Sequence, residues 1–358
     1  MQILFLLYDL HFGGGGERVT VNLANSLINR GHNVTILSLA SQKNDNIFAV
    51  DPRIKIDYLG TGNRFKQQWI NKIYSLNALR DYFGMINEPT VALAIGAYPS
   101  LLLSLLPQRS TIKKVGCQHH AFSALNKYWS LLRRMFFNRL DLMVSLTEAD
   151  RTKLKQVNPR VVVIPNAVSF YPVNKAKLEN KIILAVGRVD QPKGFDLLID
   201  AFARITTDIP GWKLRIVGDG PQKNELVRHI EQSGLSGNIE WLPPTNNIEQ
   251  QYMQAAMLVS TSRTEGLPMI MLEAQACGLP VVSFDIETGP NEIITDGKDG
   301  FLVKPFDTKQ MAHKIKLLCE TQTLRTTFGE NARQNALRFS PDKIIIMWER
   351  LFNQFSFN

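Results

Sequence analysis

The stretch Ser260-Thr-Ser-Arg-Thr-Glu-Gly-Leu-Pro-Met-Ile-Met-Leu-Glu-Ala-Gln-Ala-Cys-Gly278 decides how the second half of the chain folds. Pro268 suits the first turn of a helix and Gly278 suits its left-handed end, so residues 268–277 are predicted to form one short helix. Apart from Glu273 and Gln275 this helix is apolar all round, which predicts that it is buried. Because an unpaired buried charge is very costly, Glu273 is expected to have a partner.

A second carboxylate, Glu265, precedes Glu273 with seven residues between them. The predicted helix start lies between the two, and its free amides and dipole attract an anion such as a phosphate. Carboxylates accept paired hydrogen bonds from vicinal hydroxyls. The arrangement is therefore typical of a site for a sugar nucleotide, with amides on the diphosphate and carboxylates on hydroxyls.

Strands and helices alternate along the whole chain, which predicts parallel sheets in an α/β fold. A first series has strands at residues 2–8, 34–39, 91–95, 114–117, 142–145 and 161–164, with a helix at residues 17–30. The polar residues 169–181 are interpreted as an interdomain linker. A second series has strands at residues 182–186, 213–217, 239–242, 257–260, 281–284 and 299–303, with helices at residues 195–205 and 308–320 and a last helix at 343–352. The length of 358 residues agrees with two domains.

Several candidate ligand-binding residues follow directly after predicted strands, at the edge where open α/β sheets bind ligands. Consecutive glycines at residues 13–16 let the backbone approach a ligand closely, although a plain tight turn is the alternative. His119 or His120 could serve as a hydrogen-bond donor or base, or could be purely structural. Arg188 and Lys193 share one loop and could neutralise a diphosphate, the alternative being a solvated basic loop.

The composition is that of a soluble globular protein, with 44% hydrophobic and 20% charged residues. Three widely spaced cysteines without a Cys-x-x-Cys pattern indicate reduced thiols in a cytosolic protein, with neither a disulfide framework nor a zinc site. The apolar start lacks the features of a signal peptide, and no apolar run reaches the ~18 residues of a membrane span.

Positive charge is concentrated in the first half of the chain. Residues 1–174 hold 20 Lys/Arg and 10 Asp/Glu, whereas the remainder is nearly neutral. This asymmetry favours an anionic partner: nucleic acid, an acidic membrane surface, or a phosphate-bearing acceptor. Residues 126–139 mix basic and large aromatic side chains, as an interfacial membrane helix would. The alternative is a helix that faces the core and whose arginines are solvated.

These motifs, in this order, resemble the retaining glycosyltransferases of family four, which have the GT-B fold of two Rossmann-like domains facing each other across a cleft. The resemblance covers nearly the whole chain and is carried by Gly-Gly-x-Glu-Arg at residues 14–18, Gly-Arg-x-x-x-x-Lys-Gly at 187–194, Val-Gly-Asp-Gly-Pro at 217–221, the Glu265/Glu273 pair and Asp-Gly-Phe-Leu-Val at 299–303. It implies an acceptor-binding domain at residues 1–170 and a donor-binding domain at residues 171–339. A final helix, residues 340–358, is expected to pack back on the first domain.

The resemblance also implies a role for individual residues. Arg188 and Lys193 are expected to bind the diphosphate, Glu265 the donor sugar, and Glu273 the ribose. His119 matches the family's active-site histidine better than His120 does. The implied donor-binding set is Gly14, Gly15, Gly218, Gly266, Leu267, Pro268, Met269 and Glu273.

The expected reaction moves a hexose or N-acetylhexosamine with retention from a nucleotide-sugar to a glycan acceptor. The run at residues 283–293 is similar to members that use UDP-hexoses in bacterial surface polysaccharide assembly, including O-antigen and lipopolysaccharide. We expect a lipid-diphosphate-linked acceptor and a cytoplasmic enzyme held peripherally at the anionic inner face of the membrane. Without an Asp-x-Asp motif, no metal or other cofactor is expected, and no nucleic-acid motif is present. Two rival hypotheses are an epimerase or phosphorylase of similar topology and a non-catalytic sugar-nucleotide-binding protein.

Overall fold

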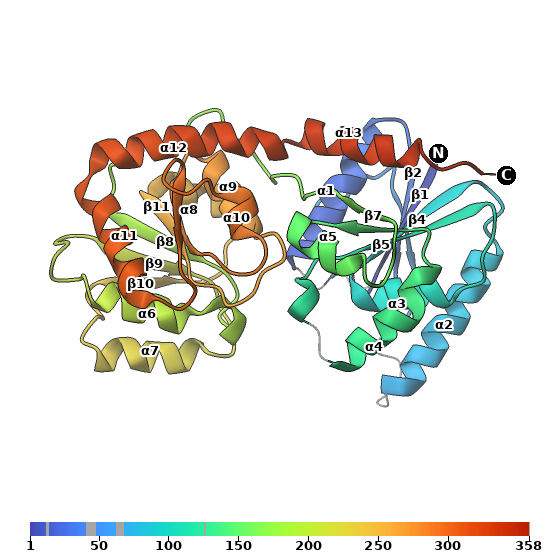
Figure 1. Cartoon of the computed structure of the whole chain (residues 1–358), viewed down its shortest axis with the longest axis horizontal. Helices are drawn as coiled ribbons and strands as arrows, with labels where there is room; N and C mark the ends of the chain where they lie inside the picture. Colours follow the sequence, from blue (N-terminus) through green and yellow to red (C-terminus); the bar gives the residue numbers. More distant parts are fainter. Residues whose placement is uncertain (12–13, 41–47, 62–67, 125–126, 358) are drawn as a thin grey trace. The chain divides into compact units, whose positions relative to one another are not determined.

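The chain divides into two compact units in the computed structural model, which describes residues 1–11, 14–40, 48–61, 68–124 and 127–357 (Figure 1). The N-terminal unit joins Met1–Ala167 with Pro341–Asn358, and the C-terminal unit is Val168–Ser340. Residues 169–181, interpreted above as a linker, lie within the C-terminal unit. Arg333 holds them there, because its Nη1 donates to the Ala276 carbonyl at 3.0 Å while its guanidinium lies 4.4 Å from the Tyr171 ring centre.

In the described part of the N-terminal unit, seven parallel strands form a sheet in the order β3-β2-β1-β4-β5-β6-β7. They are β1 (Gln2–Leu7), β2 (Asn33–Ser38), β3 (Lys55–Tyr58), β4 (Thr90–Ile95), β5 (Ile112–Cys117), β6 (Leu142–Ser145) and β7 (Val161–Val163). Strand β1, which lies between β2 and β4, is apolar at nearly every position. Such a run is typical of a parallel strand that is covered on both faces.

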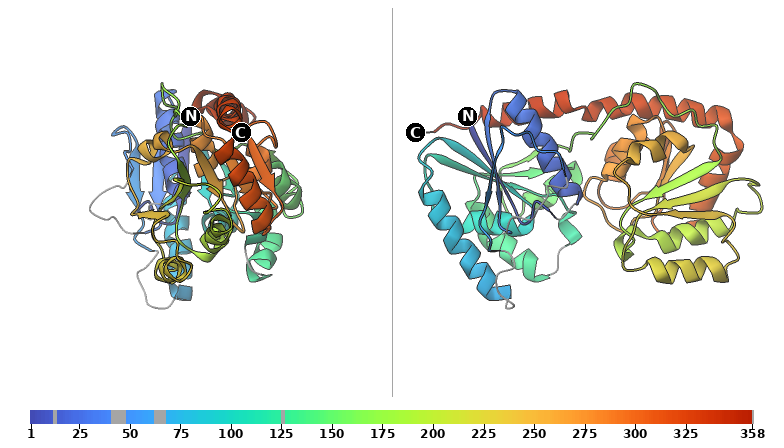
Figure 2. Two further views of the ribbon diagram at one scale, coloured as in Figure 1. Left: turned by 90° about the vertical axis from the view of Figure 1, so that its left-hand side faces the viewer. Right: turned by 180° about the vertical axis from the view of Figure 1, so that it is seen from behind.

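Helices cover both faces of this sheet. On one face lie α1 (Gly15–Asn29) and α13 (Pro341–Phe352) (Figure 2). Both share a buried apolar cluster with alternate residues of the strands. On the other face, α2 (Gln68–Gly84), α3 (Ala97–Leu105) and α5 (Glu148–Leu154) pack on the intervening strand residues. The buried positions of α13 recur every three or four residues and so form one stripe: Ile344, Ile345, Trp348, Leu351 and Phe352.

The remaining described helix of this unit, α4 (Lys127–Phe136), departs from one interpretation of its sequence, a helix with solvated arginines. Arg134 is exposed, but Arg133 has no exposed surface. The expectation of solvated arginines is therefore wrong for Arg133. Its guanidinium stacks on Phe122 at 4.2 Å from the ring centre, which keeps the cation inside the protein.

The C-terminal unit contains a second parallel sheet, with six strands in the order β10-β9-β8-β11-β12-β13 among the residues that the structure describes. They are β8 (Ile182–Val186), β9 (Lys213–Val217), β10 (Ile239–Leu242), β11 (Met257–Ser260), β12 (Val281–Phe284) and β13 (Gly300–Val303). Helices α6 (Phe195–Ala203), α7 (Lys223–Gln232) and α11 (Thr308–Glu320) share one buried cluster with these strands. Helix α9 (Met269–Ala276) contacts β11, β12 and α12 (Gln322–Ala336), while α8 (Ile248–Gln254) and the short α10 (Pro290–Ile293) lie against α9.

The two parallel sheets confirm the predicted α/β class, and each predicted strand is present within one or two residues of its bounds. The predicted helix at residues 268–277 is α9, which begins one residue later, so Pro268 is its cap residue. Strand β3 and helices α8 and α12 were not predicted from the sequence. No helix in the described ranges is both long enough and apolar enough to span a bilayer.

Helix α13 should be essential to the stability of the N-terminal unit. Phe352 has no exposed surface, so Phe352→Ala is expected to lower the free energy of unfolding by about 3–5 kcal/mol. Ile346 on the same helix is 39% exposed, and Ile346→Ala should cost only about 0.5 kcal/mol. Urea unfolding followed by a probe in this unit measures both, and equal losses would contradict the proposed packing.

Candidate active site

Two of the predicted site residues meet directly in the C-terminal unit. Lys193 Nζ lies 2.6 Å from Glu265 Oε1, and Ser262 Oγ donates to the same oxygen at 2.7 Å. Lys193 belongs to the loop after β8 and Glu265 to the loop after β11, and these strands are direct neighbours in the sheet. Both side chains keep some exposure, so the pair lies at the surface of the ligand-binding edge.

The backbones of these two loops are in close contact. Thr261 Oγ1 donates to the Gly194 carbonyl at 2.8 Å, and the Arg263 amide donates to the Pro192 carbonyl at 2.7 Å. Gly194 has φ 65°, and a Cβ placed there would lie 2.1 Å from the Thr261 carbonyl oxygen. Only glycine fits between the loops at this point.

A bidentate ion pair reinforces the same contact. Arg263 donates from Nη1 and Nη2 to the two carboxylate oxygens of Asp196 at 2.9 and 2.6 Å, and from Nη1 to the Gln191 carbonyl. Burial alone would raise the pKa of Asp196, but the hydrogen bonds and charge of Arg263 bring it below its ordinary value. Nothing in the sequence spacing of Ser262, Arg263 and Asp196 shows that the two loops meet, so these residues were not predicted.

The turn into α9 is supported by the loop after β12. Thr288 Oγ1 donates to the Glu265 carbonyl at 2.6 Å. A Cβ on Gly289, which has φ 100°, would lie 2.6 Å from the Gly266 carbonyl oxygen. The loop after β12 therefore supports the segment Gly266, Leu267, Pro268 and Met269. No side chain caps the start of α9.

Glu273 has the partners that its burial requires. Only 1% exposed, it accepts hydrogen bonds from Ser169 Oγ at 2.9 Å and from the Tyr252 hydroxyl at 3.1 Å. Ser169 comes from the start of the C-terminal unit and Tyr252 from α8. Two distant segments of chain thus orient this carboxylate, and neither had been predicted to do so.

Arg188 and Gly218 lie at the same edge but outside the Lys193–Glu265 contact. The Arg188 side chain is 61% exposed, and its Nε lies 3.4 Å from Asp190 Oδ2. Gly218 follows β9, and a Cβ there would lie 1.9 Å from the Gly187 carbonyl oxygen. Gly218 therefore lets the ends of β8 and β9 approach each other.

The other predicted site residues belong to the N-terminal unit. Gly14 is the cap residue of α1, and a Cβ on Gly15 would have no atom of a described residue within 4 Å, so packing among the described residues does not explain that glycine. His119 follows β5, and burial together with the neighbouring His120 lowers its pKa to about 4. At neutral pH His119 is therefore uncharged. In α1, burial raises the pKa of Glu17 although the charge of His120 acts to lower it.

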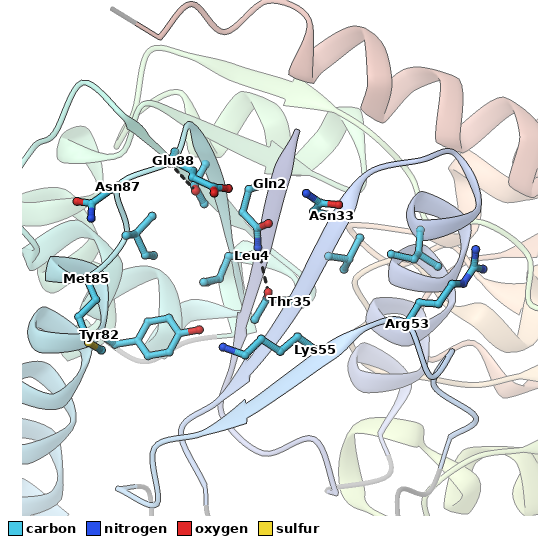
Figure 3. Close-up of a pocket in the computed structure, with 14 residues that line it drawn as sticks. Gln2, Leu4, Asn33, Thr35, Arg53, Lys55, Tyr82, Met85, Asn87 and Glu88 are labelled. Atoms are coloured by element: carbon cyan, nitrogen blue, oxygen red, sulfur yellow. Dashed lines mark hydrogen bonds between the residues drawn. The ribbon is translucent and has the colours of Figure 1, made fainter.

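A cavity of about 550 Å³ lies elsewhere in the N-terminal unit (Figure 3). Gln2, Asn33, Lys55 and Thr90, the first residues of four strands, line it together with Tyr82 of α2. Ligands of open α/β sheets bind at the opposite edge, where strands end. None of the predicted site residues lines this cavity, so the candidate active site is the one built from the loops above.

No three histidine, cysteine, aspartate or glutamate side chains are grouped in a way that could hold a metal ion, as far as the described residues extend. The charged groups described above at the carboxyl edge of the second sheet are instead Lys193, two arginines (Arg188 and Arg263) and their carboxylate partners. This set can bind an anion and hydroxyl groups.

The close contact between the two loops can be tested with a pair of glycines. Gly194→Ala combines a left-handed φ with a backbone clash and is expected to cost more than about 3 kcal/mol of unfolding free energy. Gly234 has φ 69° in open space, so Gly234→Ala should cost about 1 kcal/mol. Denaturant unfolding of both variants measures the difference, and similar costs would show that the loops do not approach as closely as described.

Relatives of known or inferred function resemble the chain over its length. A glycosyltransferase of amylovoran biosynthesis from Erwinia amylovora is 29% identical, over 98% of this chain and 99% of that protein. A Campylobacter jejuni N-acetylgalactosaminyltransferase, named for a PP-undecaprenol-linked glycan, is 24% identical over 98% of each. An exopolysaccharide phosphotransferase of Streptomyces coelicolor is 31% identical over 99% of this chain, which spans only 41% of that protein.

A solved structure shares the fold. A mutant of S. aureus TarM in complex with fondaparinux, α-GlcNAc-glycerol and UDP matches 99% of this chain and 100% of that one, with a TM-score of 0.84 at 18% identity. Two family models divide the chain between them: "Glycosyltransferase Family 4" matches residues 13–170 and "Glycosyl transferases group 1" matches residues 170–335. The chain therefore belongs to the glycosyltransferases of family four, with the GT-B type of fold.

Proposed function

We propose that this glycosyltransferase moves a hexose or N-acetylhexosamine, with retention, from a UDP-sugar to a glycan acceptor linked to a lipid diphosphate. The observation that carries the proposal is the Lys193–Glu265 contact of 2.6 Å beside the start of α9. It puts a cation for the phosphates and a carboxylate for the sugar hydroxyls at one sheet edge.

The chemistry follows from the charges that develop as the glycosyl–phosphate bond breaks. Negative charge appears on the leaving phosphate oxygen and positive charge on the anomeric carbon. Lys193, the exposed Arg188 and the free amides at the start of α9 stabilise the phosphate. The acceptor oxygen attacks from the side that the phosphate leaves, and a leaving-phosphate oxygen takes the acceptor's proton. The products are UDP and the extended glycan, and no divalent metal is needed.

The two glutamates have different tasks in this proposal. Glu265 is more exposed than Glu273. When the diphosphate binds the Lys193 ammonium, Oε1 of Glu265 becomes available to hydroxyls of the transferred sugar. Glu273 lies deeper, where Ser169 and Tyr252 fix its carboxylate for the ribose. His119, uncharged at neutral pH, acts as a neutral hydrogen-bonding group toward the sugar.

The nucleotide and the role of the pair can be tested together. UDP-sugars should raise the unfolding temperature more than GDP- or ADP-sugars, since a ligand stabilises the state that binds it.

Lys193→Ala is expected to lower turnover by about 100-fold in EDTA buffer, because the substitution removes a preorganised positive charge that stabilises the leaving group. Lys316 pairs with Asp208 on the surface, and Lys316→Ala is the matched control with normal turnover.

Three outcomes would count against the proposal. Full turnover in Lys193→Ala and Glu265→Ala would show that the pair takes no part in the reaction. An inverted anomeric configuration, read by NMR of the product, would exclude retention. Equal losses of UDP affinity in Glu265→Ala and Glu273→Ala would exclude the division between sugar and ribose.

The proposed site of action is the anionic inner face of the cytoplasmic membrane. The support is the basic excess of residues 1–174 and the exposed face of α4, which carries Tyr128, Leu131 and Met135 beside Lys127 and Arg134. Apolar side chains next to cations are typical of a helix that lies in a lipid interface. The acceptor named for the Campylobacter relative supports a lipid-linked substrate.

Membrane binding should depend on both kinds of side chain. Leu131→Ser/Met135→Ser and Lys127→Glu/Arg134→Glu are each expected to reduce co-sedimentation with anionic vesicles about tenfold, because apolar burial and charge attraction contribute separately. Met85 is 71% exposed outside α4, so Met85→Ser is the control that should bind normally. Unchanged binding by both double variants would exclude α4 as the contact surface.

A further inference from the structure

Helix α4 presents three apolar side chains outward and an arginine inward. Tyr128, Leu131 and Met135, at spacings of three and four, are 59%, 56% and 54% exposed. They share one face of the helix. Arg133 points the opposite way and has no exposed surface. Trp129, Leu132 and Phe136 are half-buried on the side toward Arg133, so α4 has apolar side chains on its outer face as well as on its inner one.

The guanidinium of Arg133 is only partly hydrogen-bonded. Its Nη2 donates to the Phe122 carbonyl at 3.0 Å, but Nε and Nη1 have no hydrogen-bond partner in the part of the chain that the structure describes. Burial lowers its pKa to about 10, although the charge of Asp150 acts in the opposite direction. An apolar side chain of similar size would avoid this desolvation, so stability does not explain the arginine.

The residue that Arg133 holds belongs to the segment that carries His119. This segment begins at Gln118, whose amide donates to the Val144 carbonyl of β6 at 3.0 Å. It ends at Phe122, whose amide donates to Asp150 Oδ1 of α5 at 3.0 Å and whose carbonyl and ring are held by Arg133. His119 therefore lies between a fixed strand and Phe122, which α5 holds by its amide and α4 holds by its carbonyl and ring.

We propose that Arg133 is a positioning residue through which the binding of α4 to an anionic lipid surface sets the position of His119. Lipid contact fixes the position of α4. The stacking and hydrogen bond of Arg133 then hold Phe122 in place, and this fixes the position of His119 in the same segment. The inference rests on the proposed function, both the transfer reaction and the membrane contact. It predicts an enzyme that anionic membranes stimulate as well as bind.

The experiment compares Arg133→Met with Arg134→Met in the full-length chain. Turnover with a short water-soluble acceptor is measured with and without saturating vesicles of phosphatidylglycerol and phosphatidylcholine, alongside co-sedimentation and thermal unfolding. The unmodified protein should be stimulated about fivefold or more, a typical size for coupling between two sites. Arg133→Met should bind vesicles normally and should have an unfolding temperature within a few degrees of that of the unmodified protein. It should nevertheless lose the stimulation by vesicles. Arg134→Met should need more vesicles but reach full stimulation once bound.

A second measurement separates positioning from a merely structural role. In Arg133→Met, the NMR titration midpoint of His119 should move from about 4 toward the ordinary value as its segment loosens. Arg133→Lys keeps a donor for the Phe122 carbonyl without the planar stacking, so it should restore part of the stimulation. If Arg133→Met does not fold, the same comparison is made between Arg133→Lys and Arg134→Lys.

The outcomes distinguish this inference from the function on which it rests. Stimulation of Arg133→Met equal to that of the unmodified protein overturns the inference, as does an unmodified protein that binds vesicles without being stimulated. Failure of the unmodified protein to bind vesicles would contradict the proposed membrane contact. Absence of turnover with every UDP-sugar would contradict the proposed transfer reaction. A lower unfolding temperature with an unchanged His119 midpoint assigns Arg133 a structural role only.

Discussion

The close approach of Gly194 to the Thr261 carbonyl is the constraint on which the candidate site depends. A side chain at Gly194 would force the loops after β8 and β11 apart, and Lys193 would no longer reach Glu265. The bidentate Arg263–Asp196 pair strengthens the same junction with two charge-assisted hydrogen bonds. A site held in this way has its charges in position before a ligand arrives, and preorganised charges contribute most to stabilising a developing anion.

Much of the fold could be predicted because its signals are local. Continuous apolar runs such as β1 identify strands that are buried on both faces, and Pro268 and Gly278 mark the two ends of α9 within one residue. The need for a partner at Glu273 also followed from local sequence, since a carboxylate in an apolar helix cannot remain unpaired. The identities of its partners did not, because Ser169 is 104 residues away and Tyr252 lies in another helix.

What the sequence did not show depends on contacts between distant segments. Strand β3 is four residues long and not fully buried, so its pattern is too short to identify it. Helix α12 has polar residues over most of its length, so its sequence shows no clear apolar stripe. Its position in the fold is set by packing against α9. Arg133 is the clearest failure. Its neighbours in sequence suggested a solvated cation. In the structure the Arg133 guanidinium stacks on Phe122 and has no exposed surface.

The N-terminal unit is assembled from two separate pieces of chain, because α13 is encoded after the whole C-terminal unit. During synthesis the residues of α13 emerge after those of the C-terminal unit. Until then, one face of the first sheet lacks the apolar stripe that contains Trp348 and Phe352. The C-terminal unit is continuous and has no such delay. The later-made unit is thus the first that can finish folding, and the first sheet must keep an apolar surface exposed in the meantime, when a nascent chain is most prone to aggregate.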